Sequence, residues 1–165
     1  MQSEPIATSI TGVYETHLPV RDLGRSIAFY RDRLGLELAT EISERQIAFF
    51  WVGRREMGML GLWQVGTGPL QMRLHFAFRM EQEAVMTACE TLRSSGIEPL
   101  DFHGNPAEEP VVIGWAPSLS VYFKDPDGHS LELIHMLDES PDKGFGIGPL
   151  SAWRAHRRNT DGKAA

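Results

Sequence analysis

The spacing of apolar residues changes along the 165-residue chain, from the two-residue period of a strand to the longer period of a helix and back. Val13 to Val20 follows the two-residue period, which predicts a strand with Glu15 and His17 on the same face. Asp22 can then cap a helix whose apolar stripe ends at Gly35. The same patterns predict five further strands, a second helix ended by a glycine, and an irregular segment: strands 36–42, 46–52, 57–63, 71–78 and 97–100, helix 81–94 with Gly96, and loop 101–117.

The most regular pattern in the second half is a pair of alternating runs joined by the turn residues of 125–128, Asp-Pro-Asp-Gly. This arrangement predicts a β-hairpin. Leu131 and Leu133 share one face of its second strand, so Glu132 points to the opposite face.

The order β-α-β-β-β is therefore predicted twice, with one strand of the second copy shortened or displaced. Short matches recur in the same order: residues 17–21 with 75–79, 35–37 with 96–98, and 60–62 with 131–133. The last of these matches places Gly61 at the position of Glu132. We interpret the chain as an internal duplication of the α+β class.

Composition narrows the class of protein without selecting a function. The net charge of −6 argues against non-specific nucleic-acid binding, which depends on basic side chains. A single cysteine, Cys89, lies in a helical pattern that predicts burial, and it excludes an intrachain disulfide. No apolar run approaches the ~18 residues of a membrane span, so a cytoplasmic protein without membrane contact is expected.

Three strands carry a polar residue suited to metal binding. His17 and His75 fall at matching places of the repeat, and Glu132 lies on the last strand. Two histidines and a carboxylate from three strands are the ligand set of an open divalent-metal site.

Several motifs together resemble the vicinal oxygen chelate superfamily, which includes glyoxalase I, fosfomycin-resistance thiol transferases, bleomycin-resistance proteins and extradiol dioxygenases. They are the His17 strand with Asp22 and residues 26–30 (Ser-Ile-Ala-Phe-Tyr), residues 34–36 (Leu-Gly-Leu), and the hairpin Asp-Pro-Asp-Gly-His-Ser-Leu-Glu of 125–132. The resemblance implies two tandem β-α-β-β-β modules that form a curved mixed sheet or partial barrel with the helices outside.

The resemblance also implies the contents of the site. His17, His75 and Glu132 would hold one divalent ion per site, and these donors suit Mn, Fe, Ni, Co or Zn. The substrate would be a small, vicinally oxygenated molecule, with a thiol as a second reactant in some members. One pair of modules per chain is the arrangement that forms homodimers in this superfamily.

The reaction is less well specified than the metal site. Glyoxalase I has a second glutamate where this chain has Gly61, and glycine cannot act as a general base. We therefore expect lyase, isomerase or thiol-transferase chemistry rather than true lactoylglutathione lyase activity. Two alternatives stay open: an extradiol-type Fe(II) dioxygenase, whose expected histidine is absent from 113–115, and a metal-free bleomycin-resistance-like binding protein.

Tyr122 resembles the tyrosine near bound fosfomycin in the resistance enzymes and is the candidate catalytic residue. Five residues are candidates for substrate binding: Met59, Gly61, Trp63, Trp115 and His103. Glycine at position 61 is expected to leave room for substrate. Residues 1–10 are expected to be flexible, 11–137 to form one domain of two modules (11–66 and 70–137), and 138–165 to be a subunit-docking extension or a disordered tail.

Overall fold

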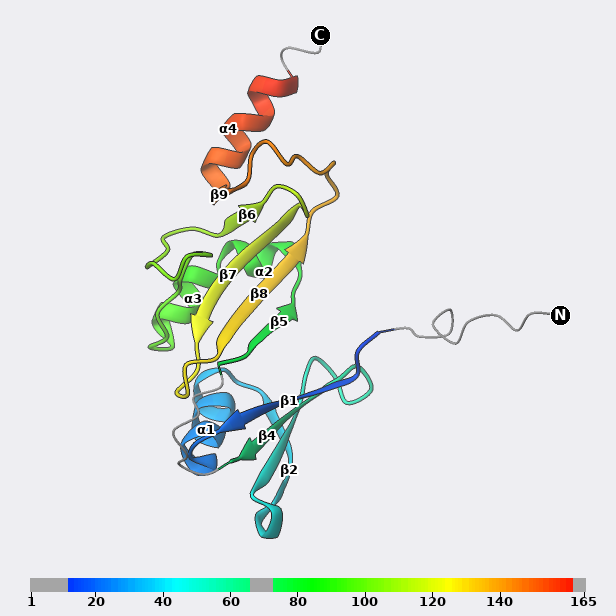
Figure 1. Cartoon of the computed structure of the whole chain (residues 1–165), viewed down its shortest axis with the longest axis vertical. Coiled ribbons are helices and arrows are strands. Elements are labelled where there is room, and N and C mark those ends of the chain that lie inside the picture. Colours follow the sequence, from blue (N-terminus) through cyan, green and yellow to red (C-terminus); the bar gives the residue numbers. More distant parts are fainter. Residues whose placement is uncertain (1–11, 66–72, 162–165) are drawn as a thin grey trace, which may run out of the picture. The chain divides into compact units, whose positions relative to one another are not determined.

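The computed structural model describes residues 12–65 and 73–161, which belong to two units divided near residue 71. The first unit contains β1 (Glu15–Val20), α1 (Leu23–Ala28), the π-helical turn η2 (Phe29–Arg33), β2 (Glu37–Ile42), the short 3-10 turn η3 (Ser43–Arg45), β3 (Ile47–Trp51) and β4 (Met59–Gln64). The second contains β5 (His75–Arg79), α2 (Gln82–Met86), α3 (Ala88–Ser94), β6 (Val111–Ile113), β7 (Ser118–Lys124), β8 (Ser130–Met136), β9 (Ile147–Pro149) and α4 (Leu150–Asp161) (Figure 1).

The two sheets share one strand order, which supports the duplication. The first sheet runs β1-β4-β3-β2, and the second runs β5-β8-β7-β6 with β9 added at its edge. In each sheet the first two strands pair in parallel and the remaining pairs are antiparallel. The α+β class and the mixed sheets of the expected fold are confirmed, and neither sheet closes into a barrel.

The first unit buries one face of its sheet. Leu18 on β1 and Leu60 and Leu62 on β4 are at most 1% exposed, and the helical segment supplies the buried Ile27 and Tyr30. Because side chains alternate along a strand, His17 and Gly61 lie on the other, open face. This second face of the first sheet is therefore separate from the apolar core formed by the leucines and the helical segment.

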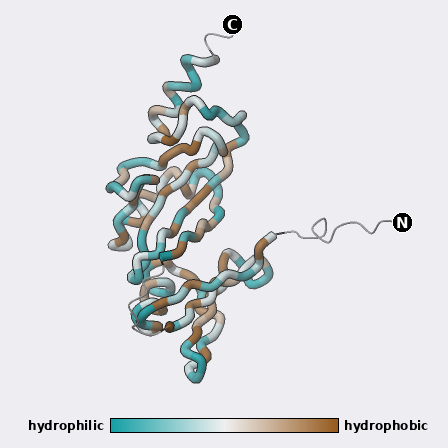
Figure 2. The backbone as a smooth tube through the Cα atoms, in the orientation of Figure 1, coloured by the Kyte–Doolittle hydropathy of each residue, from teal (hydrophilic) through white to brown (hydrophobic). Residues whose placement is uncertain are grey.

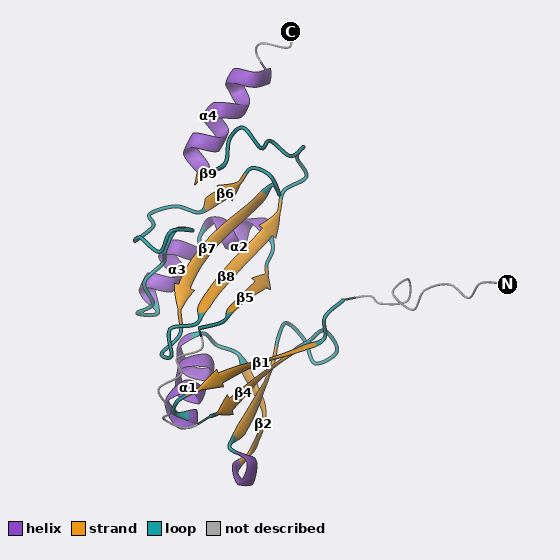
Figure 3. Ribbon diagram, in the orientation of Figure 1, coloured by secondary structure: helices purple, strands orange, loops and turns teal. Residues whose placement is uncertain are grey.

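The second unit uses the same arrangement, with α2 and α3 behind the sheet formed by β5, β8, β7 and β6 (Figure 3). Its core includes Val121 and Phe123 on β7, Leu131 on β8, and Cys89 on α3. Burial of Cys89, as predicted, raises the pKa of its thiol. The intervening residues of β7 and β8, which include Tyr122 and Glu132, face the opposite side of the sheet.

The predicted helix ends agree with the structure at three positions. The Asp22 side chain accepts a hydrogen bond from the Arg25 backbone N–H at 2.9 Å, as a helix cap does. Gly35 and Gly96, which follow the two helical segments, have positive φ angles of 79° and 69° that favour glycine. Both predicted helices are irregular, however: the first continues as a π-helical turn and the second divides at Thr87.

One strand prediction and one loop prediction in the second half were wrong. The segment 97–100 contributes only isolated bridges at Leu100, and β6 forms inside the stretch that was expected to be irregular. All three residues of β6 are buried, and Figure 2 shows this segment as strongly hydrophobic. The short run lies between Pro110 and Gly114, which mask its strand character in the sequence.

The C-terminal segment is ordered as β9 and α4. Trp153 on α4 is 1% exposed, its indole N–H donates to Glu139 at 3.0 Å, and its ring packs against Phe145. The described part of this segment, up to Asp161, is therefore packed against the second unit through Trp153. Docking to another subunit stays a prediction. The junction between the two expected modules and the N-terminal residues 1–10 lie outside the described residues. Over the described ranges no helix is both long and apolar enough to cross a membrane.

Candidate metal and substrate site

The second unit brings together two of the three predicted metal ligands. His75 projects from β5 and Glu132 from β8, the neighbouring parallel strand. The Nε2 atom of His75 lies 3.1 Å from Oε2 of Glu132. The imidazole is about half exposed, whereas the carboxylate is buried. One imidazole and one carboxylate therefore meet at the open face of the second sheet.

The second oxygen of the Glu132 carboxylate is the notable feature of this pair. Oε1 is buried and has no hydrogen-bond partner among the residues that the structure describes. Buried carboxylate oxygens are normally hydrogen-bonded or coordinated, because leaving them without a partner is costly. The donor set and this oxygen fit a divalent cation.

Tyr122, the candidate catalytic residue, lies directly opposite Glu132 in the β7–β8 ladder. Its side chain is 7% exposed, and its ring centroid lies 6.1 Å from that of His75. Burial, and next the negative charge of Glu132, raise the pKa of Tyr122 above its usual value. A hydrogen bond with the Glu132 carboxylate acts in the same direction, so the phenol and the carboxylate interact at this face of the sheet.

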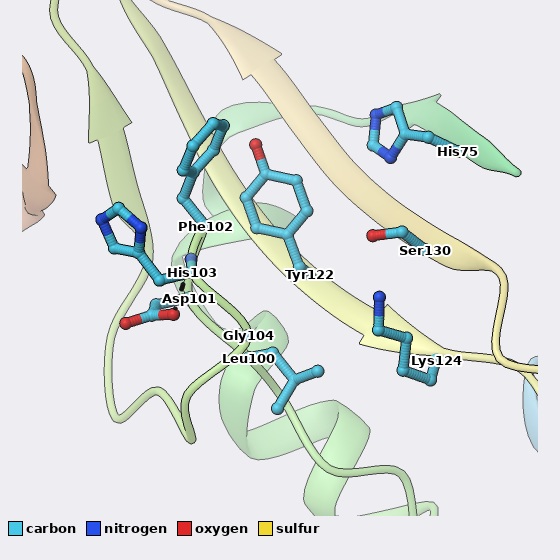
Figure 4. A pocket seen from close by; sticks show the side chains of 9 residues that line it. All are labelled: His75, Leu100, Asp101, Phe102, His103, Gly104, Tyr122, Lys124 and Ser130. Atoms are coloured by element: carbon cyan, nitrogen blue, oxygen red, sulfur yellow. Dashed lines mark hydrogen bonds between the residues drawn. The ribbon is translucent and has the colours of Figure 1, made fainter. Parts of the chain in front are cut away.

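A cavity of about 360 Å³ opens beside these residues. Figure 4 shows Tyr122 between Phe102, on the loop that follows Leu100, and His75. The lining residues are His75, Leu100, Asp101, Phe102, His103, Gly104, Tyr122, Lys124 and Ser130. The predicted substrate-binding residue His103 therefore lies at the cavity. A volume of this size suits a small molecule.

The two charged residues that line the cavity, Asp101 and Lys124, differ in whether their side chains have partners within the protein. The Asp101 carboxylate accepts hydrogen bonds from the backbone N–H groups of His103 and Asn105, both at 2.8 Å, and so serves its own loop. The Lys124 side chain has no ion pair or hydrogen bond recorded with another described residue. Its ammonium is thus available to a negatively charged group of a ligand.

Of the cavity residues that the sequence analysis did not name, Lys124 and Ser130 lie on the strands of the hairpin. They are direct partners across the hairpin, in the same ladder that pairs Tyr122 with Glu132. Counting two residues along each strand from that pair would have placed them on the open face. Asp125 fixes the turn between them, because its Oδ1 accepts the backbone N–H groups of Asp127 and His129 at 3.0 and 2.8 Å.

His17, the third predicted ligand, belongs to the first unit and has a different local environment. Its Nε2 lies 2.6 Å from Oε1 of Glu15, and its Nδ1 accepts a hydrogen bond from the Trp63 indole N–H. Gly61 is its direct partner in the β1–β4 ladder. The expected open space at Gly61 is not present: a Cβ added there would lie 2.6 Å from Cε1 of His17.

The remaining predicted substrate-binding residues lie in different settings. Met59 and Trp63 flank Gly61 on the same face of β4, and the guanidinium of Arg45 lies 5.3 Å from the Trp63 ring. Trp115 is 59% exposed in the loop between β6 and β7, outside the lining of the cavity. Over their described residues, neither unit gathers three His, Cys, Asp or Glu side chains into a single metal-binding group.

The duplicated β-α-β-β-β order and the open sheet faces agree with the fold that the sequence motifs implied. The chain belongs to the Glyoxalase/Bleomycin resistance protein/Dioxygenase superfamily, whose family model matches residues 12–133. The resemblance seen in the sequence is thereby confirmed.

Individual relatives agree with this assignment. The lactoylglutathione lyase of Salmonella typhimurium is 32% identical over 142 residues, which cover 81% of this chain and 96% of that protein. An integron cassette protein from the Halifax Harbour sewage outfall is 32% identical, with a TM-score of 0.66 over 77% of this chain and all of its own. The fosfomycin-resistance protein FosX of Listeria monocytogenes, solved with Mn(II) and sulfate, is 25% identical, with a TM-score of 0.55 over 79% and 94% of the two chains.

Proposed function

We propose that this protein is a divalent-metal-dependent enzyme of the superfamily, which acts on a small molecule with neighbouring oxygen atoms by lyase, isomerase or thiol-transferase chemistry. The observation that carries this proposal is the His75–Glu132 pair on the open face of the second sheet. His75 also lines the cavity, so a bound ion and a bound substrate would share one side chain.

In this proposal His75 and Glu132 bind the ion. The sequence analysis named His17 as a third ligand. The unpartnered Oε1 of Glu132 supports binding of a cation, because a cation would satisfy this buried oxygen. The manganese in the FosX structure shows that a related fold holds such an ion.

The bound ion would polarise the oxygens of the substrate and stabilise negative charge that develops on them. Tyr122 would donate its phenolic proton in a hydrogen bond to one of these oxygens. Lys124 would attract a negatively charged substituent, and Phe102 would cover an apolar part, since its ring meets that of Tyr122 at a centroid distance of 5.9 Å. Together the three side chains would orient a small, oxygen-rich anion.

Metal titration of the purified full-length chain tests the proposal. Isothermal titration with MnCl₂ should give about one ion per chain, and His75→Ala or Glu132→Gln should lower the affinity at least 100-fold. His156→Ala is the matched control, because His156 lies on α4 and pairs with Asp142 at 2.7 Å. Unchanged binding in both site variants would refute the metal-dependent enzyme. Thermal melts in which no metal stabilises the fold but an aromatic ligand does would favour a binding protein.

The proposal includes a homodimer, as the resemblance implies. Analytical ultracentrifugation of the same preparation measures the assembly state, and a monomer at every concentration would contradict this part.

A further inference from the structure

We propose that Lys124 and Ser130 form an oxyanion subsite of the cavity, which selects substrates that carry a carboxylate or phosphonate group beside a flat apolar part. This inference rests on the proposed function, because it names the class of substrate for the same cavity. All residues of the subsite belong to the second unit, and the subsite binds its anion without a metal ion.

The strand registers place the two residues in one row across the open face. Lys124 on β7 is the ladder partner of Ser130 on β8, and Ser130 is the ladder partner of His75 on β5. Neighbouring strands lie about 4.8 Å apart, so the row extends about 10 Å across the sheet. Tyr122 and Glu132 form the next row on the same face. The His75–Glu132 pair therefore adjoins one end of the row, and Lys124 forms the other end.

The donors of the subsite point into the cavity. Figure 4 shows the Lys124 side chain among the lining residues, with its ammonium directed toward the Ser130 hydroxyl. An ammonium offers three N–H donors and a hydroxyl offers one O–H donor, which suits the acceptor oxygens of a carboxylate or phosphonate. Neither side chain has an ion pair or hydrogen bond recorded with another described residue. Both are therefore available to a ligand.

The carboxylates near the cavity have partners other than Lys124. Asp101 accepts hydrogen bonds within its own loop, including one from the side-chain amide of Asn105 at 3.2 Å. Glu132 pairs with His75 through Oε2. The positive charge of Lys124 is thus not balanced by these two carboxylates, and it favours an anion at this end of the cavity.

The turn beside the subsite is tied to the neighbouring strand. The imidazole of His129 is 1% exposed, and its Nδ1 accepts the backbone N–H of Leu74 at 3.0 Å. The backbone N–H of Ser130 donates to the Leu74 carbonyl at 2.7 Å. These two bonds connect the hairpin to the start of β5. The row of donors is therefore fixed before a ligand arrives, which lowers the cost of binding.

Aromatic rings supply the apolar part of the cavity. Phe102 is 47% exposed, and its ring meets that of Tyr122 edge to face at a centroid distance of 5.9 Å. Small-molecule sites combine apolar walls with a few placed polar groups. A flat group against these rings, with an oxyanion at Lys124, satisfies both parts. Benzoate and phenylphosphonate are the simplest molecules of this kind.

Titration of these two probes into the full-length chain, freed of metal on a chelating resin, tests the subsite. Both anions should bind in low-salt Tris buffer. Benzamide, the uncharged analogue of benzoate, should bind about tenfold more weakly or worse, because hydrogen bonds with charged groups are the stronger ones. The relative affinity of the two anions then indicates whether the natural substrate carries a carboxylate or a phosphonate.

Variants assign the preference to the named side chains. Lys124→Met should abolish the preference for benzoate over benzamide, Lys124→Arg should retain it, and Ser130→Ala should weaken both anions several-fold. Arg79→Met is the matched control and should bind like the unmodified chain, because Arg79 is a cation on β5 outside the cavity lining. Thermal melts identify any variant that fails to fold.

The inference is overturned if neither anion binds, if benzamide binds as tightly as benzoate, or if Lys124→Met keeps the preference. Titration of MnCl₂ into the His75→Ala variant separates this outcome from failure of the proposed function. Weakened Mn²⁺ binding there, with no anion preference in the unmodified chain, would refute the subsite alone. Unchanged Mn²⁺ binding there, with an anion preference that depends on Lys124, would refute the metal site and support the subsite.

Discussion

Tyr122 and Glu132 face each other across the β7–β8 ladder, and the carboxylate contributes to keeping the phenol protonated. Burial of Tyr122 has the larger effect on its pKa. A raised pKa in the folded state means that the folded protein binds the proton more tightly than the unfolded chain does. This contribution to stability is complete below the unfolded pKa of about 10 and is lost as the pH rises above it.

Tyr122→Phe should therefore flatten the loss of stability at alkaline pH. Urea unfolding at pH 7, 9 and 11 measures the free energy of unfolding, and the unmodified chain should decline more steeply above pH 10 than the variant. Tyr14→Phe, which alters a 49% exposed tyrosine, is measured in parallel as the control for removing a hydroxyl. Equal declines in all three proteins would show that the Tyr122 phenol is not buried against a charge.

Hemithioacetal isomerisation should be slow, despite the similarity to lactoylglutathione lyases. No carboxylate projects from position 61, so the first half lacks the general base expected there. Turnover of the methylglyoxal–glutathione adduct, followed by absorbance with Mn²⁺ present, should be at least 100-fold below that of a lactoylglutathione lyase assayed in parallel. Comparable rates would show that another side chain supplies the base.

Gly61→Glu should not simply add a fourth ligand. The new side chain needs the space that the His17 ring occupies, so the single variant should bind Mn²⁺ more weakly than the unmodified chain. In the double variant with His17→Ala this space is vacant, and Gly61→Glu should then strengthen binding relative to His17→Ala alone. Calorimetric titration of the four proteins gives the comparison, and tighter binding by the single variant would contradict the position of the ring.

Trp153→Ala should destabilise the second unit. This ring is almost completely buried, and truncating such a side chain costs about 3–5 kcal/mol. Urea unfolding should show a loss of this size, whereas Trp115→Ala, which removes a 59% exposed ring, should cost less than about 0.5 kcal/mol. A small effect at Trp153 would mean that α4 is not anchored through this residue.

Local signals predicted much of the fold. A helix cap or a helix end depends on residues within one turn of backbone, as at Asp22, Gly35 and Gly96. The hairpin at 125–128 likewise depends on its own turn residues. The three-residue strand β6 could not be predicted in the same way, because burial by neighbouring elements, rather than an alternating pattern, makes Val111–Ile113 a strand.

The candidate site shows a different limit of sequence reasoning. Alternation in a strand repeats every two residues, so a shift of two leaves every side chain on the same face. The pattern that selected His17 as the match of His75 therefore suits Glu15 equally well. Only the ladder pairs, His17 with Gly61 and Ala77 with Glu132, distinguish the two alignments.

The strand β9 has a consequence for the solubility of the chain. It covers the outer edge of β6, with Val112 paired to Gly148, and it lies beyond the stretch 12–133 that the family model matches. A chain shortened after Met136 would leave the backbone N–H and C=O groups along that side of β6 unpaired, and exposed strand edges recruit strands from other molecules. By pairing with β6, the strand β9 thus prevents the corresponding strand of another molecule from adding to the sheet at this edge.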